Sequence, residues 1–79
     1  MSNIEHYNQS FREAFQVEDS QLAGLTYQSV TLWDSVGHMS LIALLEEAFD
    51  IMMETDDIID FSSYEKGKQI LAKKYGLPF

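Results

Sequence analysis

The sequence contains no cysteine, which excludes disulfide bonds and thiolate metal sites. Repeats and low-complexity segments are also absent, and no apolar run approaches the roughly 20 residues that cross a bilayer. The first five residues carry neither the basic region nor the apolar region of a signal peptide. We therefore expect one small cytoplasmic domain over residues 1–79, a monomer without membrane insertion.

Basic residues are few, and acidic residues are concentrated in one segment. Residues 34–60 contain eight acids and no Lys or Arg, whereas the rest of the chain has five acids against five bases, so the whole net charge of −8 lies in that segment. Such a field disfavours nucleic acid and attracts basic protein surfaces. A solvated surface that only keeps the protein soluble is the alternative. The acids lack the spacing of an EF-hand loop, so we expect no structural calcium site.

Apolar residues at helical spacing predict an all-α fold, a small four-helix bundle of three main helices and one short helix. The first helix, residues 3–15, begins at a capping box formed by Ser2 and Glu5. A loop over residues 16–33 should tuck a few apolar side chains under the helices. The second helix begins after Asp34 and should be central and mostly buried.

The remaining two helices are predicted from their N-terminal signals. The short helix should begin with Thr55 as its cap and direct Ile58, Ile59 and Phe61 inward. The last helix should begin at a capping box formed by Ser62 and Glu65 and stop at Gly76. Gly67 inside that helix costs about 1 kcal/mol relative to alanine, which a close approach between helices would explain.

The segment around Ser35 has a recognisable pattern. Asp34-Ser35-Val36 begins the second helix and is followed by Met39, Ile42 and Leu45-Glu46-Glu47-Ala48-Phe49-Asp50. This pattern, together with the helix order and the chain length, resembles the acyl carrier protein family. The resemblance covers residues 3–75. Asp19-Ser20 also contains the dipeptide, but no long amphipathic helix follows it.

The resemblance implies a carrier, not an enzyme. Ser35 would be the covalent attachment point of a 4'-phosphopantetheine arm derived from coenzyme A, and Asp34 would help place the metal and coenzyme A of a phosphopantetheinyl transferase. Acyl groups would travel as thioesters to enzymes of fatty-acid, polyketide or other specialised acyl biosynthesis. The Gly37-His38 pair after the motif is more similar to carriers of specialised pathways.

Two further sets of residues follow from the resemblance. Acyl-loading and acyl-transferring enzymes with basic faces would dock on Val36, Met39, Glu46, Glu47, Asp50, Glu54, Asp56 and Asp57. A pocket for the acyl chain would be lined by Ile42, Phe49, Met53, Ile59, Phe61 and Ile70. Ordinary core packing explains the second set equally well.

Two alternatives stay open. The chain could be a carrier-like adaptor without an arm, which the intact Asp34-Ser35 pair argues against. It could also be a small hydrolase using Ser35 and His38, which lie three residues apart on one helical face. That chemistry needs an oriented base and an oxyanion hole, for which a chain this short offers little room. We expect His38 to point to solvent and His6 to lie on the surface of the first helix.

Overall fold

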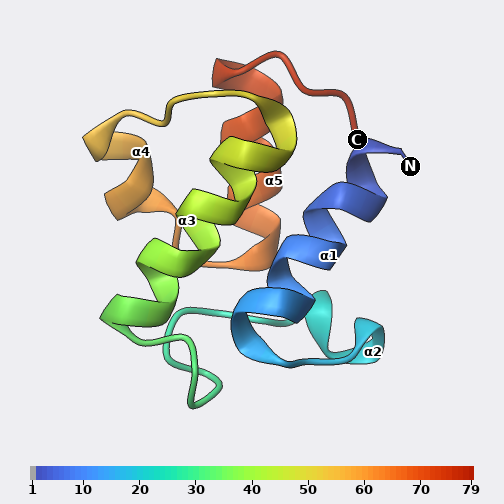
Figure 1. The fold of residues 1–79 in the computed structure, drawn as a ribbon, viewed down its shortest axis with the longest axis vertical. Helices are drawn as coiled ribbons and strands as arrows, with labels where there is room; N and C mark the ends of the chain where they lie inside the picture. Colours follow the sequence, from blue (N-terminus) through green and yellow to red (C-terminus); the bar gives the residue numbers. More distant parts are fainter. Residues whose placement is uncertain (1) are drawn as a thin grey trace.

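A computed structural model describes residues 2–79, and Met1 lies outside the described residues. The described chain is an all-α bundle of three longer helices and two short ones around one core (Figure 1). The helices are α1 (Asn3–Phe15), α2 (Asp19–Leu22), α3 (Ser35–Phe49), α4 (Thr55–Asp60) and α5 (Tyr64–Lys74). The predicted fold class is confirmed, and α2 is an addition to it.

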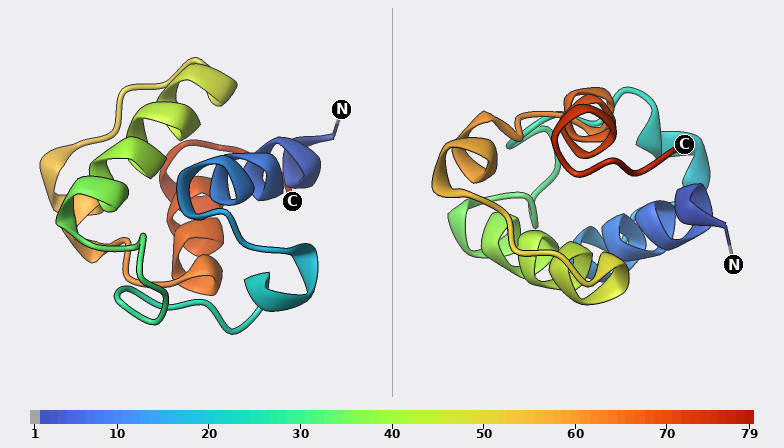
Figure 2. Two further views of the ribbon diagram at one scale, coloured as in Figure 1. Left: turned by 60° about the horizontal axis from the view of Figure 1, so that its bottom comes forward. Right: turned by 90° about the horizontal axis from the view of Figure 1, so that it is seen from above.

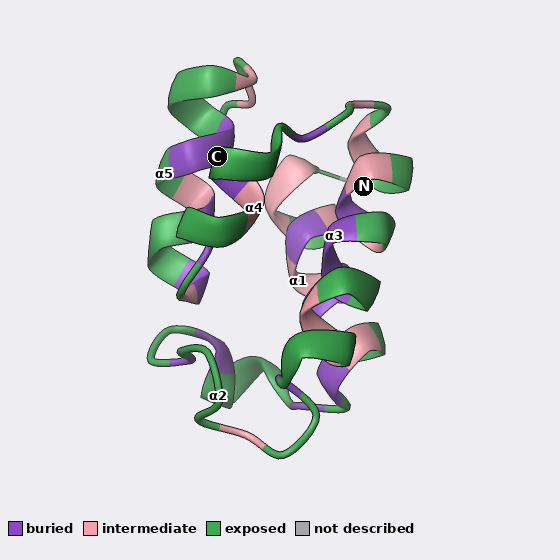
Figure 3. Ribbon diagram, turned by 90° about the vertical axis from the view of Figure 1, so that its left-hand side faces the viewer, coloured by how far each residue is buried: buried purple, intermediate pink, exposed green. Residues whose placement is uncertain are grey.

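The longer helices form the bundle, and α4 closes one end of it. Seen from above, α1 and α3 form one side, α5 lies on the other, and α4 stands beside α3 (Figure 2). The two chain ends meet near the start of α1, where the side-chain amide of Asn3 donates to the carbonyl of Pro78 over 3.0 Å. α4 is mostly exposed, with Asp57 as its buried residue (Figure 3).

α1 forms as its sequence predicts. The hydroxyl of Ser2 accepts a hydrogen bond from the backbone N–H of Glu5, which satisfies one of the free donors of the first turn. Tyr7, Phe11 and Phe15 are buried along one face. The helix ends at Gln16, whose φ of +56° places it in the left-handed conformation that terminates helices.

α3 differs from its prediction in how much of it is buried. Leu41, Ile42 and Leu45 are buried, but Val36 and Met39 are 74% and 53% exposed. The prediction of a mostly buried helix is therefore wrong. Only α1 and the core side of the bundle cover α3, because α4 is too short to cover its outer face.

The segment between α1 and α3 is more ordered than the predicted loop. It contains α2, where the side chain of Gln21 accepts a hydrogen bond from the backbone N–H of Glu18 over 3.0 Å. The expected tucking of apolar side chains is confirmed, since Leu22, Leu25 and Trp33 are buried.

The starts of α4 and α5 are each displaced by one residue from the prediction. Glu54 rather than Thr55 is the cap of α4, and Ser63 rather than Ser62 caps α5 by accepting from the N–H of Lys66. The prediction that Ile59 points inward is also wrong, because its side chain is 71% exposed. α4 has too few residues to bury both of its adjacent isoleucines, and Ile58 occupies the inner position.

The core is dominated by aromatic rings contributed by four parts of the chain. The buried rings are Tyr7, Phe11, Phe15, Trp33, Phe61 and Tyr64. Gly67 of α5 faces this cluster, and a β-carbon there would meet Phe61 at 2.2 Å and the hydroxyl of Tyr7 at 2.4 Å. The close approach that would explain a glycine inside α5 is therefore present. The ring hydroxyl of Tyr7 donates to the carbonyl of Tyr64 over 2.7 Å.

Candidate functional site

Ser35 is the first residue of α3, and its side chain is exposed. The preceding Asp34 caps the helix as predicted: its carboxylate accepts from the N–H of Gly37 over 2.8 Å, and its carbonyl accepts from the N–H of His38 over 2.8 Å. Within the described residues, the N–H groups of Ser35 and Val36 have no protein acceptor. Such free donors at a helix start attract negatively charged groups.

Gly37 fixes how the preceding loop meets α3. A β-carbon at this position would lie 1.7 Å from the backbone carbonyl oxygen of Leu32 and 3.0 Å from its carbonyl carbon. Only glycine allows this close approach, because the neighbour is backbone and cannot rotate away. The backbone of Leu32 is thus held against the first turn of α3. This turn also contains Ser35, two residues before Gly37.

A pocket of about 370 Å³ lies beside Ser35, between α3, α4 and the loop before α3. It is lined by Tyr27, Ser35, His38, Met39, Ile58, Ile59, Phe61 and Ser62. Most of these side chains are apolar or aromatic. A group attached to Ser35 would therefore have apolar surface within immediate reach.

Only part of the predicted acyl pocket lies here. Ile59 and Phe61 line the pocket beside Ser35, and so does Met39, which was predicted for docking. The other four residues predicted for an acyl pocket do not line it: Ile42, Phe49, Met53 and Ile70. Ile42, Met53 and Ile70 are core residues, and Phe49 packs partly buried against the core. Ordinary core packing accounts for the positions of these four residues, and a role in an acyl pocket stays a prediction for them.

His38 does not point to solvent, contrary to the prediction. Its Nδ1 accepts from the indole N–H of Trp33 over 3.0 Å, and its Nε2 lies 2.7 Å from the carbonyl oxygen of Ile58. Since Nδ1 accepts, Nε2 carries the proton and donates to Ile58, which fixes the neutral tautomer. Both ring nitrogens are therefore used, and neither is directed at Ser35 as a hydrolytic base would be.

The predicted docking acids fall into two groups. The carboxylates of Glu47, Asp50, Glu54 and Asp56 belong to exposed residues. Glu46 is half-buried, and its carboxylate accepts from the N–H of Met53 over 2.9 Å, so it closes the turn after α3.

Asp57 is not available for docking, which corrects the prediction. It is 1% exposed, and its carboxylate lies 2.6 Å from the ammonium of Lys74 and accepts from the hydroxyl of Tyr75 over 2.7 Å. These two hydrogen bonds, first that from Lys74 and then that from Tyr75, hold the pKa of Asp57 below its usual range although burial acts against them. Asp57 therefore fastens α4 to α5.

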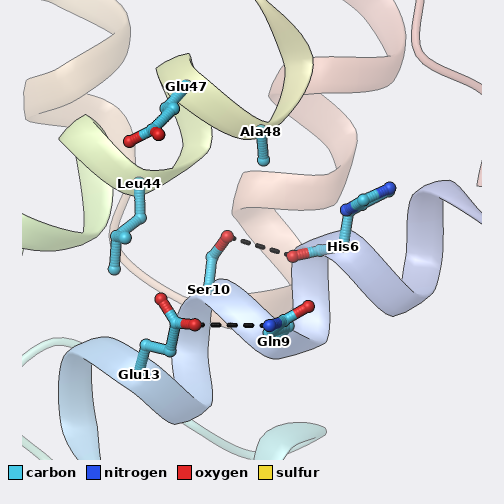
Figure 4. Close-up of a pocket in the computed structure, with 7 residues that line it drawn as sticks. All are labelled: His6, Gln9, Ser10, Glu13, Leu44, Glu47 and Ala48. Atoms are coloured by element: carbon cyan, nitrogen blue, oxygen red, sulfur yellow. Dashed lines mark hydrogen bonds between the residues drawn. The ribbon is translucent and has the colours of Figure 1, made fainter. Parts of the chain in front are cut away.

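A second pocket, of about 340 Å³, lies between α1 and α3. Figure 4 shows His6, Gln9, Ser10 and Glu13 of α1 facing Leu44, Glu47 and Ala48 of α3. Several of its polar groups are already paired, since Ser10 donates to the carbonyl of His6 and Gln9 donates to Glu13. It is separate from the pocket beside Ser35, with which it shares no lining residue.

Three residues of the Ser35 pocket were not foreseen from the sequence: Tyr27, Ile58 and Ser62. Tyr27 reaches the pocket because Thr26 pairs with Ser63 in an isolated antiparallel bridge, a long-range contact without a local sequence signal. The environment of His38 has a local sequence signal, since Trp33 lies five residues earlier and its indole N–H needs an acceptor.

Other kinds of site are limited by the same geometry. Among residues 2–79, no three His, Asp or Glu side chains come together as a metal site, and no helix is long and apolar enough to cross a membrane.

Comparisons with models of protein families, with curated proteins and with solved structures found no match.

Proposed function

We propose that this protein is an acyl carrier that bears a 4'-phosphopantetheine arm on Ser35. The observation that carries the proposal is an exposed serine at the first position of a long helix, capped by an acid and opening directly onto an apolar pocket. The resemblance of the segment that begins at Asp34 to the acyl carrier family supports the same conclusion.

The attachment step is a phosphoryl-type transfer that a separate transferase performs. The Ser35 hydroxyl loses its proton and attacks a phosphorus of the coenzyme A pyrophosphate. A phosphodiester bond forms to Ser35 Oγ, the pyrophosphate P–O bond breaks, and adenosine 3′,5′-bisphosphate leaves. The attached arm then supplies the thiol that carries acyl groups as thioesters.

The residues around Ser35 suit that group. The free N–H groups of Ser35 and Val36 can donate to a phosphodiester, and the positive end of the helix dipole favours its charge. One carboxylate oxygen of Asp34 is engaged by Gly37, which leaves the other to contact a metal ion held by the transferase.

Partner enzymes would dock on the exposed side of α3 and α4. Val36 and Met39 provide apolar contact next to Ser35, and the exposed acids Glu47, Asp50, Glu54 and Asp56 provide negative charge along the end of α3, the turn after it and the start of α4. Charges of this kind steer a basic partner and fix its orientation more than they add affinity.

Intact-mass measurement tests the proposal. The protein is incubated with coenzyme A, magnesium and a broad-specificity phosphopantetheinyl transferase, beside Ser35→Ala and the matched control Ser20→Ala. Ser20 is exposed and also follows an aspartate, but it lies in the four-residue α2 and not at the start of a long helix. We expect one arm on the natural sequence and on the control, and none on Ser35→Ala.

A folded protein that gains no arm with two different transferases would refute the carrier function. An adaptor would then be favoured, because exposed apolar side chains such as Val36, Met52 and Ile59 are typical of a binding surface. Ester turnover lost in His38→Ala would instead revive the hydrolase alternative.

A further inference from the structure

We infer that His38 closes the pocket beside Ser35 toward the core and thereby restricts the carrier to compact acyl groups. The inference rests on the proposed function and specifies its cargo. Groups of up to about eight carbons would lie in the pocket, and longer chains would extend into solvent instead of entering the bundle.

His38 is held rigidly at the inner end of the pocket. Its two ring nitrogens are bound to different segments, Nδ1 to the indole of Trp33 in the loop and Nε2 to the carbonyl of Ile58 in α4. The ring cannot rotate out of the way without losing both hydrogen bonds. Because those partners are partly buried, the loss would leave polar groups without water or protein partners.

The rings behind His38 block the path into the core that runs past this residue. His38 lies nearly parallel to Trp33, with ring centres 6.2 Å apart and 14° between the planes, and it meets Phe61 edge-on at 6.1 Å. Trp33 is fully buried and stacks in turn on Phe15 at 4.8 Å. An acyl chain could pass only by displacing several packed aromatic rings at once, and each ring buries a large apolar area.

The size of the pocket sets the expected limit. Engineered cavities of about 150 Å³ hold one benzene molecule, which is six carbons. A pocket of about 370 Å³ therefore holds at most roughly fifteen heavy atoms. The pocket is open to solvent on one side, and the end of the arm occupies part of it, so the acyl group itself is left with about half of that number.

The outer wall of the pocket is apolar and partly exposed. Met39 is 53% exposed and Ile59 is 71% exposed in the described structure, so both have surface that a compact acyl group can cover. Each methylene that is fully buried multiplies the ratio of bound to free cargo by about four. Covering this surface is therefore sufficient to favour a bound state without any opening of the core.

The test compares acyl chains of increasing length on the same protein. The transferase loads acyl-coenzyme A analogues of two to sixteen carbons onto Ser35, and loading is verified by mass before any comparison. Thermal midpoints and retention on a hydrophobic column are then measured for each form. We expect the midpoint to rise up to about eight carbons and then to stay level, while column retention begins to rise.

Variants of His38 decide whether this residue sets the limit. In His38→Ala, which vacates the space of one ring in front of Trp33 and Phe61, we expect the midpoint to continue rising for a few carbons beyond eight. In His38→Gln, whose side chain fills similar space and can donate to the Ile58 carbonyl, the limit should return. A purely structural role of His38 would lower all midpoints equally and leave the dependence on chain length unchanged. Met52→Ala, an 88% exposed position outside the pocket, is the control.

Each outcome decides one of the two proposals. A midpoint of the natural protein that rises steadily to sixteen carbons would overturn the closed pocket, and parallel profiles of the natural protein and His38→Ala would overturn the role of His38. Failure of the arm to attach is seen by mass alone and would overturn the carrier function, and with it the proposed cargo.

Discussion

Gly37 lies in a helix, which glycine disfavours, because a larger residue would not fit against Leu32. Replacing glycine by alanine inside a helix ordinarily stabilises by about 1 kcal/mol. Here the new β-carbon would lie 1.7 Å from the carbonyl oxygen of Leu32, so the loop or the helix start must shift. We expect Gly37→Ala to lower the free energy of unfolding by about 1–3 kcal/mol, the usual cost of overpacking.

Gly24→Ala is the matched control for this prediction, because a β-carbon at Gly24 meets nothing within 4 Å. It should be neutral or stabilising by up to about 1 kcal/mol. Urea unfolding followed by circular dichroism measures both variants. If Gly37→Ala and the natural protein were equally stable, the backbone at Leu32 could move away from the new β-carbon without a cost in free energy.

Asp34 is the cap of α3, and the proposed function gives it a second role as the acid that helps arm transfer to Ser35. Asparagine caps helices as well as aspartate does, whereas alanine loses the cap at about 0.5–2 kcal/mol. We therefore expect Asp34→Asn to retain stability and lose most of the rate of arm transfer, and Asp34→Ala to lose both. Thermal unfolding and a mass-based transfer time course distinguish them. Full transfer to Asp34→Asn would limit the residue to capping.

At the residue scale, local signals predicted the caps at Ser2 and Asp34 and the position of Ser35. They did not predict the hydrogen bond between His38 and Ile58, because the tertiary fold brings Ile58 of α4 to His38. Exposure was also missed for Ile59, since helical spacing cannot tell which of two adjacent isoleucines a six-residue helix will bury.

At the scale of elements, α4 is attached at both sides. His38 of α3 binds its Ile58 carbonyl, and on the other side Asp57 binds Lys74 and Tyr75 near the end of α5. Tyr75 also accepts from the N–H of Glu54, at the cap of α4, over 2.9 Å. Ile58 and Ile59 of α4 line the Ser35 pocket, so the hydrogen bonds that hold α4 also fix the position of this wall of the pocket.

The Asp57 attachment predicts a pH dependence. The pKa of Asp57 is lowered by Lys74 and then by Tyr75, so its contribution is fully present above the ordinary value of 3.8 and is lost as pH falls through the lowered pKa of the folded state. The pKa of Lys74 is raised by the hydrogen bond to Asp57, so its contribution is fully present below 10.5 and is lost at higher pH.

Asp57→Asn tests this attachment. Its thermal midpoint should be lower than that of the natural protein at neutral pH, and the difference should shrink below 3.8 as Asp57 becomes protonated. Asp56→Asn, an exposed neighbour in the same turn, should change little at any pH. A difference between Asp57→Asn and the natural protein that is constant down to strongly acidic pH would mean that the ion pair contributes nothing.

At this scale the sequence predicted the three longer helices closely but not α2 or the exact starts of α4 and α5. Adjacent serines at positions 62 and 63 offer two possible caps, and only tertiary contact selects between them. The Thr26–Ser63 bridge joins the loop before α3 to the start of α5 and is consistent with the later start. α2 has four residues, too few to show a hydrophobic period.

For the whole molecule, the charge distribution is the feature that the sequence describes most completely. Residues 34–60 contain eight acids and no Lys or Arg, and the structure pairs Asp57 with Lys74 and engages the half-buried Glu46 with the N–H of Met53. The exposed remainder lies on α3, α4 and the turn between them. The field that an approaching enzyme meets is therefore strongest along the end of α3, the turn after it and α4.

This distribution predicts that arm transfer is sensitive to salt. Screening shortens the reach of exposed charges from about 10 Å at 0.1 M salt to about 3 Å at 1 M. Because steering raises association rates by at least about tenfold, kcat/KM for transfer to Ser35 should fall by a similar factor over that range. Steady-state kinetics with the transferase at several salt concentrations provide the measurement.

Charge reversal separates local steering from net charge. Glu47→Lys lies in the last turn of α3, where a cation complements the helix dipole and should not destabilise the fold. Glu65→Lys changes the net charge equally but lies on α5, outside the acidic segment. We expect transfer to Glu47→Lys to be slower and less sensitive to salt, and transfer to Glu65→Lys to stay close to that of the natural protein. Equal effects of both variants would mean that only the overall charge matters, and that the acids on α3 and α4 do not form a docking surface.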